Sequence, residues 1–229
     1  MNQLITTMFA LAVACATMAV PAQDLKPDAA QGATKVAMCI GCHGIAGYQA
    51  SFPQIYQVPM IAGQSETYIR SALSAYKAGE RKHPTMRAVA GSMTPQDILD
   101  LAAYYSKLGL VGGGTVSAVP VKAPSERVQA LITRDKENAC TKCHGVNFNT
   151  PNDATVAKLA GQHPDYLLVA LKAYKTDNNP QVGRAHAVMS VQAKKFTDNA
   201  DLKELAQYIS GLPGDLKVVP QSRMHYAAK

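Results

Sequence analysis

Two short stretches of the chain hold residues whose types and spacing suit a specific chemistry. Each has two cysteines separated by two residues and a histidine directly after the second, as Cys39-x-x-Cys42-His43 and Cys140-x-x-Cys143-His144. Such a cysteine pair serves as a disulfide, as a redox dithiol, as half of a zinc site or as an attachment point for haem c. The histidine favours haem, because two thioether bonds at the porphyrin edge would hold its imidazole beneath the iron.

The other uses of the motif fit this chain less well. A zinc site would require the two pairs to meet across 97 intervening residues, although each pair lies in its own repeat. A redox dithiol has no use for the following histidine and is typical of a βαβ setting that this sequence lacks. We therefore expect two covalently bound haem c groups. The expected attachment thiols are Cys39, Cys42, Cys140 and Cys143, and the expected proximal ligands are His43 and His144.

A six-coordinate electron-transfer haem needs a second axial ligand, and the sequence offers methionines for this role. Met86 and Met189 occupy equivalent places, 43 and 45 residues after the two proximal histidines. We expect these two to be the ligands. We expect Met38, Met60 and Met93 to fill the core, which is the ordinary role of methionine.

Two further residue types recur beside these methionines. His83 and His186, each three residues before its methionine, offer the alternative of two histidines per iron, although a plain place on the loop is the more ordinary expectation. Arg81 and Arg184 either meet haem propionates through charge-assisted hydrogen bonds or are solvated loop charges.

The second half of the chain copies the first. Residues 61–64, Ile-Ala-Gly-Gln, return as Leu-Ala-Gly-Gln at 159–162, and Ala-Tyr-Lys at 75–77 returns at 173–175. These landmarks keep their order, which indicates a tandem duplication of a unit of about 95 residues. A Gly-rich and then Pro-containing stretch between the copies is typical of a linker. The expected organisation is a signal peptide at 1–22, an N-terminal domain at 23–110, a linker at 111–124 and a C-terminal domain at 125–229.

The elements that must position these residues are helices. Apolar spacing, N-caps and stop residues predict three main helices per domain, separated by long loops. The predicted helices are 28–36, 65–78 and one from 94 in the first copy, then 164–175 and 199–210 in the second, with a polar tail after Gly211. Alternating strand patterns are absent, so the expected fold class is all-α, with two tandem haem domains.

Composition restricts the class of protein, and the N-terminus predicts its cellular location. The apolar fraction of 47% and charged fraction of 17% exclude a disordered chain, yet the chain has no Trp, so a bound haem would supply apolar filling. The apolar run at 4–20 ends in small residues, which predicts a signal peptide cleaved after Ala22 and export to the periplasm. The alternatives are a retained anchor or lipidation of Cys15, and either would associate the protein with the membrane.

The chain resembles the dihaem cytochrome c4 family, and each half is similar to a class I cytochrome c domain. The resemblance lies in the two Cys-x-x-Cys-His motifs, in the stretches 59–64 and 158–162, in the segments Met86 to Asp97 and Asp201 to Ile209, and in Met189. It implies His/Met ligation in both domains, a periplasmic location and one-electron transfer between respiratory proteins. In this family a proline carbonyl accepts a hydrogen bond from the proximal histidine; Pro59 fits this pattern, whereas the second half has Ala157.

The expected function is electron transfer without a substrate of its own. Expected partners are redox proteins such as a quinol-oxidising complex, a dehydrogenase or a terminal oxidase. The alternatives are a dihaem enzyme (a peroxidase or a sulfur-compound oxidoreductase) and a cytochrome subunit of a dehydrogenase. Nucleic acid is excluded as a partner, because the chain lacks a basic stripe with interleaved aromatic residues.

The distribution of charge suggests where a partner would dock. From Lys122 onward there are 15 basic and 10 acidic residues, so this part carries +5 of the net charge of +7. We expect Lys142, Lys194 and Lys195 to steer an acidic partner to the edge of the second haem. The alternative is an ordinary solvated surface.

Overall fold

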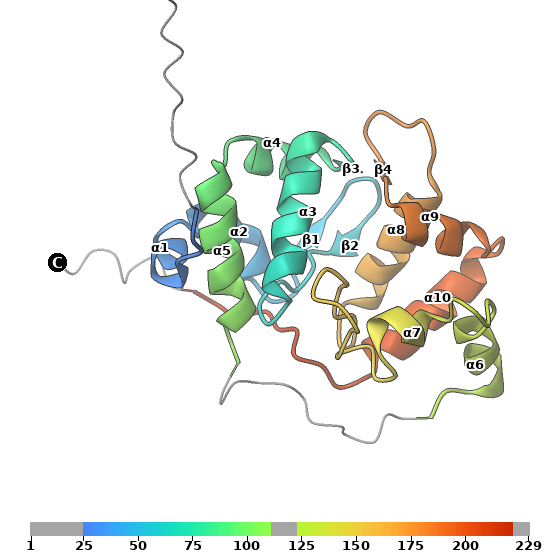
Figure 1. Ribbon diagram of the computed structural model, residues 1–229. Helices are drawn as coiled ribbons and strands as arrows, with labels where there is room; N and C mark the ends of the chain where they lie inside the picture. The colour runs from blue at the N-terminus through green and yellow to red at the C-terminus, as the bar shows by residue number, and fades with distance from the viewer. Residues whose placement is uncertain (1–24, 111–122, 222–229) are drawn as a thin grey trace, which may run out of the picture.

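Helices carry most of the regular structure in this computed structural model, which describes residues 25–110 and 123–221 (Figure 1). The predicted signal peptide and most of the predicted linker lie outside the described residues. In the first half the elements are α1 (Ala29–Thr34), α2 (Ala37–His43), β1 (Gln49–Ala50), β2 (Tyr56–Gln57), α3 (Glu66–Ala78), β3 (Arg81–Lys82), α4 (Pro84–Gly91) and α5 (Pro95–Lys107). In the second half they are α6 (Glu126–Ile132), α7 (Cys140–His144), α8 (Pro164–Lys175), β4 (Gly183–Arg184), α9 (Ala187–Lys194) and α10 (Asn199–Ser210).

The longer helices lie where the sequence predicted them, namely α3, α5, α8 and α10. The sequence predicted three main helices per domain, and the described residues form five helices in each half. The additional ones, α2, α4, α7 and α9, have only five to eight residues each. Helices this short are marginal in isolation and depend on caps and on tertiary contacts, so periodicity alone does not reveal them.

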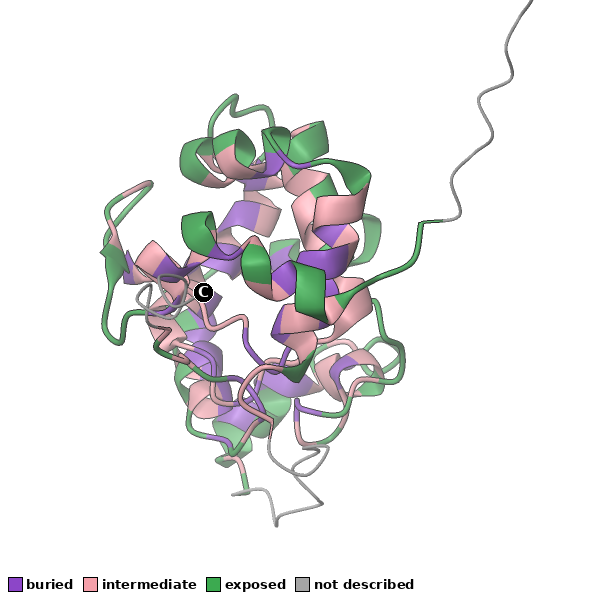
Figure 2. Cartoon of the chain, turned by 90° about the vertical axis from the view of Figure 1, so that its left-hand side faces the viewer, coloured by how far each residue is buried: buried purple, intermediate pink, exposed green. Residues whose placement is uncertain are grey.

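The first domain packs around the crossing of α1 and α5, with α3 beside α5. Its buried apolar cluster has members such as Val36, Ile69, Met93 and Leu101. Met93 is 3% exposed and fills the core as predicted, but Met38 is 53% exposed, so its predicted core role is wrong. A separate cluster fills the second domain between α6, α8 and α10. Each domain therefore has its own core. Figure 2 colours the buried residues of the chain purple.

Ion pairs fix the N-terminal helix of each domain to its last long helix. The α5 helix starts with a capping box between Thr94 and Asp97. The ammonium of Lys35, just after α1, lies 2.7 Å from Asp97 and 2.7 Å from the buried carboxylate of Asp100. In the second domain, arginines from and after α6 bind Asp201 of α10 in the same way.

Acid should weaken the contact between α1 and α5 through Asp97. The hydrogen bond from Lys35 lowers the pKa of Asp97 from 3.8 to about 2. A carboxyl group whose pKa is depressed by folding adds stability that is complete above its unfolded value and is lost as the pH falls through its folded value. We expect Lys35→Met to lower the free energy of unfolding by about 2 kcal/mol at neutral pH. We also expect it to flatten the loss of stability between about pH 4 and pH 2. Denaturant unfolding of both proteins across this range measures the two effects, and parallel curves would contradict this role for Lys35.

The two domains meet along a face near their haem motifs. The short strands β3 and β4 pair antiparallel across the interface, with Arg81 opposite Arg184. The backbone amide of Gln57 in β2 donates to the carboxylate of Asp165 in α8 at 2.7 Å. Figure 1 shows β2, β3 and β4 grouped between the domains. The interface therefore consists of short strands, their loops and the α8 helix, all of which flank the candidate sites.

The segment after α10 returns to the first domain and forms part of the interface. Lys217 makes an antiparallel bridge with Ala62, and its ammonium donates to the carbonyl of Gly109 at 3.1 Å. Leu212 and Leu216 are buried. The predicted polar tail after Gly211 is therefore wrong for the described part, which Figure 1 shows in red running from α10 back to the first domain.

Candidate haem sites

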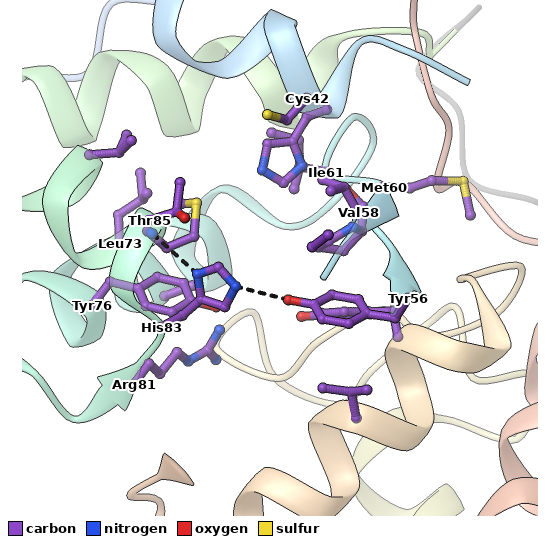
Figure 3. Close-up of a pocket in the computed structure, with 18 of the residues that line it drawn as sticks. Cys42, Tyr56, Val58, Met60, Ile61, Leu73, Tyr76, Arg81, His83 and Thr85 are labelled. Carbon is purple, nitrogen blue, oxygen red and sulfur yellow. Dashed lines mark hydrogen bonds between the residues drawn. The ribbon is translucent and has the colours of Figure 1, made fainter. Parts of the chain in front are cut away.

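The α2 helix directs the first motif toward a cavity. Cys39 and Cys42 are one helical turn apart, and His43 follows as the last residue of the helix. All three line a cavity of about 390 Å³, shown in Figure 3. The walls are mostly apolar, with contributions from residues such as Ile61, Leu73 and Val58. A flat apolar ring with a central metal ion fits such walls.

The four cysteines are in the form that attachment requires. Cys39, Cys42, Cys140 and Cys143 are not paired in disulfides. Burial raises the pKa of Cys39 and of Cys140 above the ordinary thiol value. The thiols are therefore available for thioether bonds, and the donor set fits haem c.

Each of the two predicted proximal histidines has one ring nitrogen fixed by a backbone carbonyl. The Nδ1 of His43 lies 2.7 Å from the carbonyl oxygen of Pro59, and the Nδ1 of His144 lies 2.9 Å from that of Ala157. A carbonyl only accepts, so Nδ1 carries the proton and the lone pair of Nε2 is free to bind a metal. Burial lowers the pKa of both histidines although the carbonyl bonds oppose this, and a neutral imidazole is the form that binds iron. The histidine-to-carbonyl hydrogen bond is therefore present in both domains, and the bond to Ala157 is longer than the bond to Pro59.

The predicted methionine ligands start from equivalent positions on α4 and α9. Met86 lines the same cavity as His43. Its backbone N–H donates to the Nδ1 of His83 at 3.3 Å, and the backbone N–H of Met189 donates to the Nδ1 of His186 at 3.2 Å. The two duplicated histidines are therefore the N-caps of the short helices that carry the methionines.

This capping role was missed from the sequence, because histidine is not among the preferred N-cap residues. Pro84, directly after His83, was the available signal, since proline favours the first position of a helix. The other nitrogen of His83 is also engaged, at 3.0 Å from the hydroxyl of Tyr56, as Figure 3 shows. His186 has only the capping bond in the described residues and is exposed. With both nitrogens of His83 engaged, ligation by two histidines is disfavoured in the first domain.

Arg81 and Arg184 bring two cations together at the interface. The guanidinium of Arg81 donates to the hydroxyl of Tyr68 at 3.2 Å, and that of Arg184 donates to Tyr166 at 2.9 Å. Each also lies over tyrosine rings of its own domain. Within residues 25–110 and 123–221, neither guanidinium has a carboxylate partner within salt-bridge distance. Arg81 is buried and Arg184 is half-buried. Cations without a carboxylate partner in such surroundings favour the binding of an anionic group.

The second domain helps to close the cavity of the first. Leu159, Tyr166 and Arg184 line it together with residues of the first domain. The sequence predicted two separate haem domains and did not indicate this sharing, because a repeat pattern contains no information on how its copies pack.

Comparison with known proteins supports the same assignment. A model of the cytochrome c family matches residues 29–109 and 126–213. Cytochrome c4 of Stutzerimonas stutzeri is 33% identical over 199 residues, which cover 81% of this chain and 89% of that protein. The thiosulfate dehydrogenase electron acceptor of Thiomonas intermedia is 29% identical over 191 residues, which cover 78% of this chain and 80% of that protein.

The crystal structure of reduced recombinant cytochrome c4 from Pseudomonas stutzeri aligns with a TM-score of 0.59 and 30% identity, covering 82% of this chain and 100% of that one. The predicted all-α fold of two tandem cytochrome c domains is confirmed. Matched in both halves and over most of its length, this chain belongs to the cytochrome c family as a dihaem electron-transfer cytochrome of the c4 type.

Proposed function

We propose that this protein is an exported electron carrier that works in the periplasm with two covalently bound haem c groups. The observation that carries the proposal is the first cavity, where two free thiols, a carbonyl-fixed histidine and a methionine line one apolar space. The proposed attachment residues are Cys39, Cys42, Cys140 and Cys143, and the proposed axial pairs are His43 with Met86 and His144 with Met189. No helix in the described ranges, 25–110 and 123–221, is long and apolar enough to cross a bilayer.

Each haem c, when bound, supplies an iron that takes up and releases one electron between its ferric and ferrous forms. The chain's own residues determine how easily it does so. The carbonyls of Pro59 and Ala157 orient the proximal imidazoles and make them more basic. The sulfurs of Met86 and Met189, once bound to iron, would favour the ferrous form, and the apolar walls would exclude water. The guanidinium groups of Arg81 and Arg184 are suited to hold the propionates.

A role as carrier is favoured over a role as enzyme because both halves have a methionine in the equivalent position. A peroxidase or a sulfur-compound oxidoreductase needs one haem with an open distal site or an unusual ligand. The relative from Thiomonas intermedia is named as an electron acceptor of thiosulfate dehydrogenase. We therefore propose a dehydrogenase as one class of electron donor, beside a quinol-oxidising complex, and a terminal oxidase as one class of acceptor.

A single set of spectra tests the proposal. A pyridine haemochrome spectrum combined with an iron determination should give two haems c per chain. The ferrous protein should then resist carbon monoxide at both haems, because a bound methionine sulfur closes each distal side. One haem per chain, or rapid binding of carbon monoxide at one site, would contradict the carrier role.

The two haems should have different potentials. The shorter bond from His43 to the rigid Pro59 makes that imidazole the more basic, which lowers the potential of the first haem relative to the second. We expect Ala157→Pro to lower the potential of the second haem and to narrow the gap. A redox titration followed by haem methyl NMR signals measures both potentials. A single shared potential that Ala157→Pro leaves unchanged would count against this.

The basic residues expected to attract a partner to the second haem are partly neutralised. Lys194 is paired with Asp177, and Lys195 with Asp135. Lys142 is exposed and its ammonium donates to the carbonyl of Glu137 at 2.8 Å. Of these three lysines, Lys142 is therefore the one with no carboxylate within salt-bridge distance in the described residues.

We expect Lys142→Glu to slow association with an acidic redox partner several-fold at low ionic strength. The difference should fade at physiological salt, where the Debye length is about 8 Å. Stopped-flow electron transfer measured against ionic strength tests this. Lys107→Glu makes the same charge change at the end of α5 in the first domain and serves as the control. If the electron-transfer rate depends on ionic strength equally in the two variants, the charge of Lys142 does not steer docking.

A further inference from the structure

The peptide group between Pro59 and Met60 joins the first proximal histidine to the other domain. Its carbonyl oxygen, on Pro59, accepts from the Nδ1 of His43 at 2.7 Å. Its N–H, on Met60, donates to the side-chain oxygen of Gln162 in the second domain at 3.0 Å. The side-chain nitrogen of Gln162 then donates to the carbonyl of Met60 at 2.9 Å. One peptide group therefore stands between His43 and a glutamine of the partner domain.

The second domain has the same arrangement in reverse. The peptide group between Ala157 and Lys158 accepts from the Nδ1 of His144 at 2.9 Å through its oxygen. Its N–H donates to the side-chain oxygen of Gln64 at 3.0 Å, and the nitrogen of Gln64 donates to the carbonyl of Lys158 at 3.0 Å. Gln64 and Gln162 end the repeated Ala-Gly-Gln stretches, so the duplication carries a reciprocal pair of contacts.

These two glutamines are buried, and both polar atoms of each side chain are hydrogen-bonded. Gln64 is 5% exposed and Gln162 is 3% exposed. Each side-chain oxygen also accepts from the backbone N–H that follows it, on Ser65 at 2.9 Å and on His163 at 3.1 Å. A flipped amide would point its NH₂ group at two N–H donors, so the hydrogen-bond network fixes its orientation.

A hydrogen bond at one end of a peptide group strengthens the bond at its other end. When the Met60 N–H donates to Gln162, the peptide is polarised and the Pro59 oxygen becomes a better acceptor. A better acceptor at Nδ1 makes the imidazole of His43 more basic, and a more basic axial ligand favours ferric iron. Second-shell hydrogen bonding of this kind is one of the levers on haem potential.

We propose that Gln162 lowers the potential of the first haem and that Gln64 lowers the potential of the second, each acting through a peptide group of the other domain. They are positioning residues that touch neither proximal histidine. The proposal rests on the proposed function, since it takes His43 and His144 as iron ligands. The redox potential of each haem would then depend on a glutamine of the opposite domain.

The test replaces each glutamine by methionine, which has a similar length but neither a strong acceptor nor a donor. We expect Gln162→Met to raise the potential of the first haem and to leave the second nearly unchanged. Gln64→Met should do the reverse. NMR-monitored redox titration assigns each potential, and the Nδ1 proton signal of the affected histidine should move upfield as its hydrogen bond weakens. A merely loosened interface gives the opposite sign, because entering water stabilises the ferric form and lowers the potential.

Two further variants separate tuning from general packing. Ser65→Ala removes a hydroxyl that donates to the carbonyl of Ala154 across the same interface, and it should shift neither potential. Gln162→Glu keeps an oxygen acceptor for the Met60 N–H and should hold the first potential at or below the wild-type value.

The proposal is overturned if Gln162→Met lowers the first potential, shifts both haems equally or shifts neither. The haem count and the methionine-to-iron band of the wild type are measured beforehand. If both are as expected but the glutamine variants do not shift the potentials as predicted, the glutamines do not tune the haems, and the proposed carrier function is unaffected. If the wild type lacks two His/Met haems, the proposed function itself fails.

Discussion

Met86→Ala should abolish the methionine-to-iron band of one haem while the other haem keeps its band, and Met189→Ala should do the same at the opposite site. This weak near-infrared band marks a methionine sulfur bound to ferric haem. The expectation follows from the equivalent places of the two residues on α4 and α9 and from the position of Met86 in the wall of the first cavity. Loss of the sulfur should also lower the potential of the affected haem, because the thioether favours the ferrous form.

Met93→Leu is the matched control for this experiment. Met93 lines the same cavity but is 3% exposed and belongs to the apolar core. Its replacement should leave both bands in place. If both bands survive in the double variant of Met86 and Met189, those methionines are not the ligands. Ligation through His83 and His186 would then have to be reconsidered, although both nitrogens of His83 are engaged elsewhere.

Gly32→Ala should be the most damaging single-methyl change in the first domain. Gly32 is buried in α1 where this helix crosses α5. A Cβ atom there would lie 2.1 Å from the carbonyl oxygen of Asp100 and 2.7 Å from the Cβ of Tyr104. Both atoms belong to a long helix that cannot move locally, so α1 must move away and the contact that carries the Lys35 ion pairs opens. We expect a loss of about 3 kcal/mol or more in the free energy of unfolding.

The control for this change is Gly91→Ala at the end of α4. Gly91 is also helical, but a Cβ atom there meets nothing within 4 Å. Alanine is the better helix former, so this variant should be neutral or more stable by up to about 1 kcal/mol. Denaturant unfolding of the two holoproteins compares them directly. A loss at Gly32 no larger than the change at Gly91 would show that the crossing of the helices adapts to the methyl group.

Several features followed from the sequence because they depend on local spacing. Two cysteines and a histidine within five residues define an attachment motif wherever the chain places them. The duplication distinguished Met86 and Met189 from the other methionines and made them the predicted iron ligands. The helices α3, α5, α8 and α10 were predictable because their caps and their apolar periodicity lie within the segments themselves.

Other features depended on contacts between residues far apart in the chain. The core role assigned to Met38 was wrong because burial is a property of the packed chain and not of the residue type. The capping role of His83 became visible only when the backbone took its extended conformation before α4 and Tyr56 was brought to its other nitrogen. The segment after α10 appeared polar, yet Leu212 and Leu216 are buried, and Leu212 belongs to the apolar core of the second domain.

The clearest case is the pair of glutamines. The sequence reveals Gln64 and Gln162 as repeated residues and says nothing of their partners, which lie 94 and 102 residues away in the chain. The residues that recur in a repeat reflect the packing within each copy. They do not show how the two copies face each other, because that depends on the complementarity of two folded surfaces. The chemistry at each iron was therefore set by local sequence, whereas the connection between the two sites was decided by tertiary structure alone.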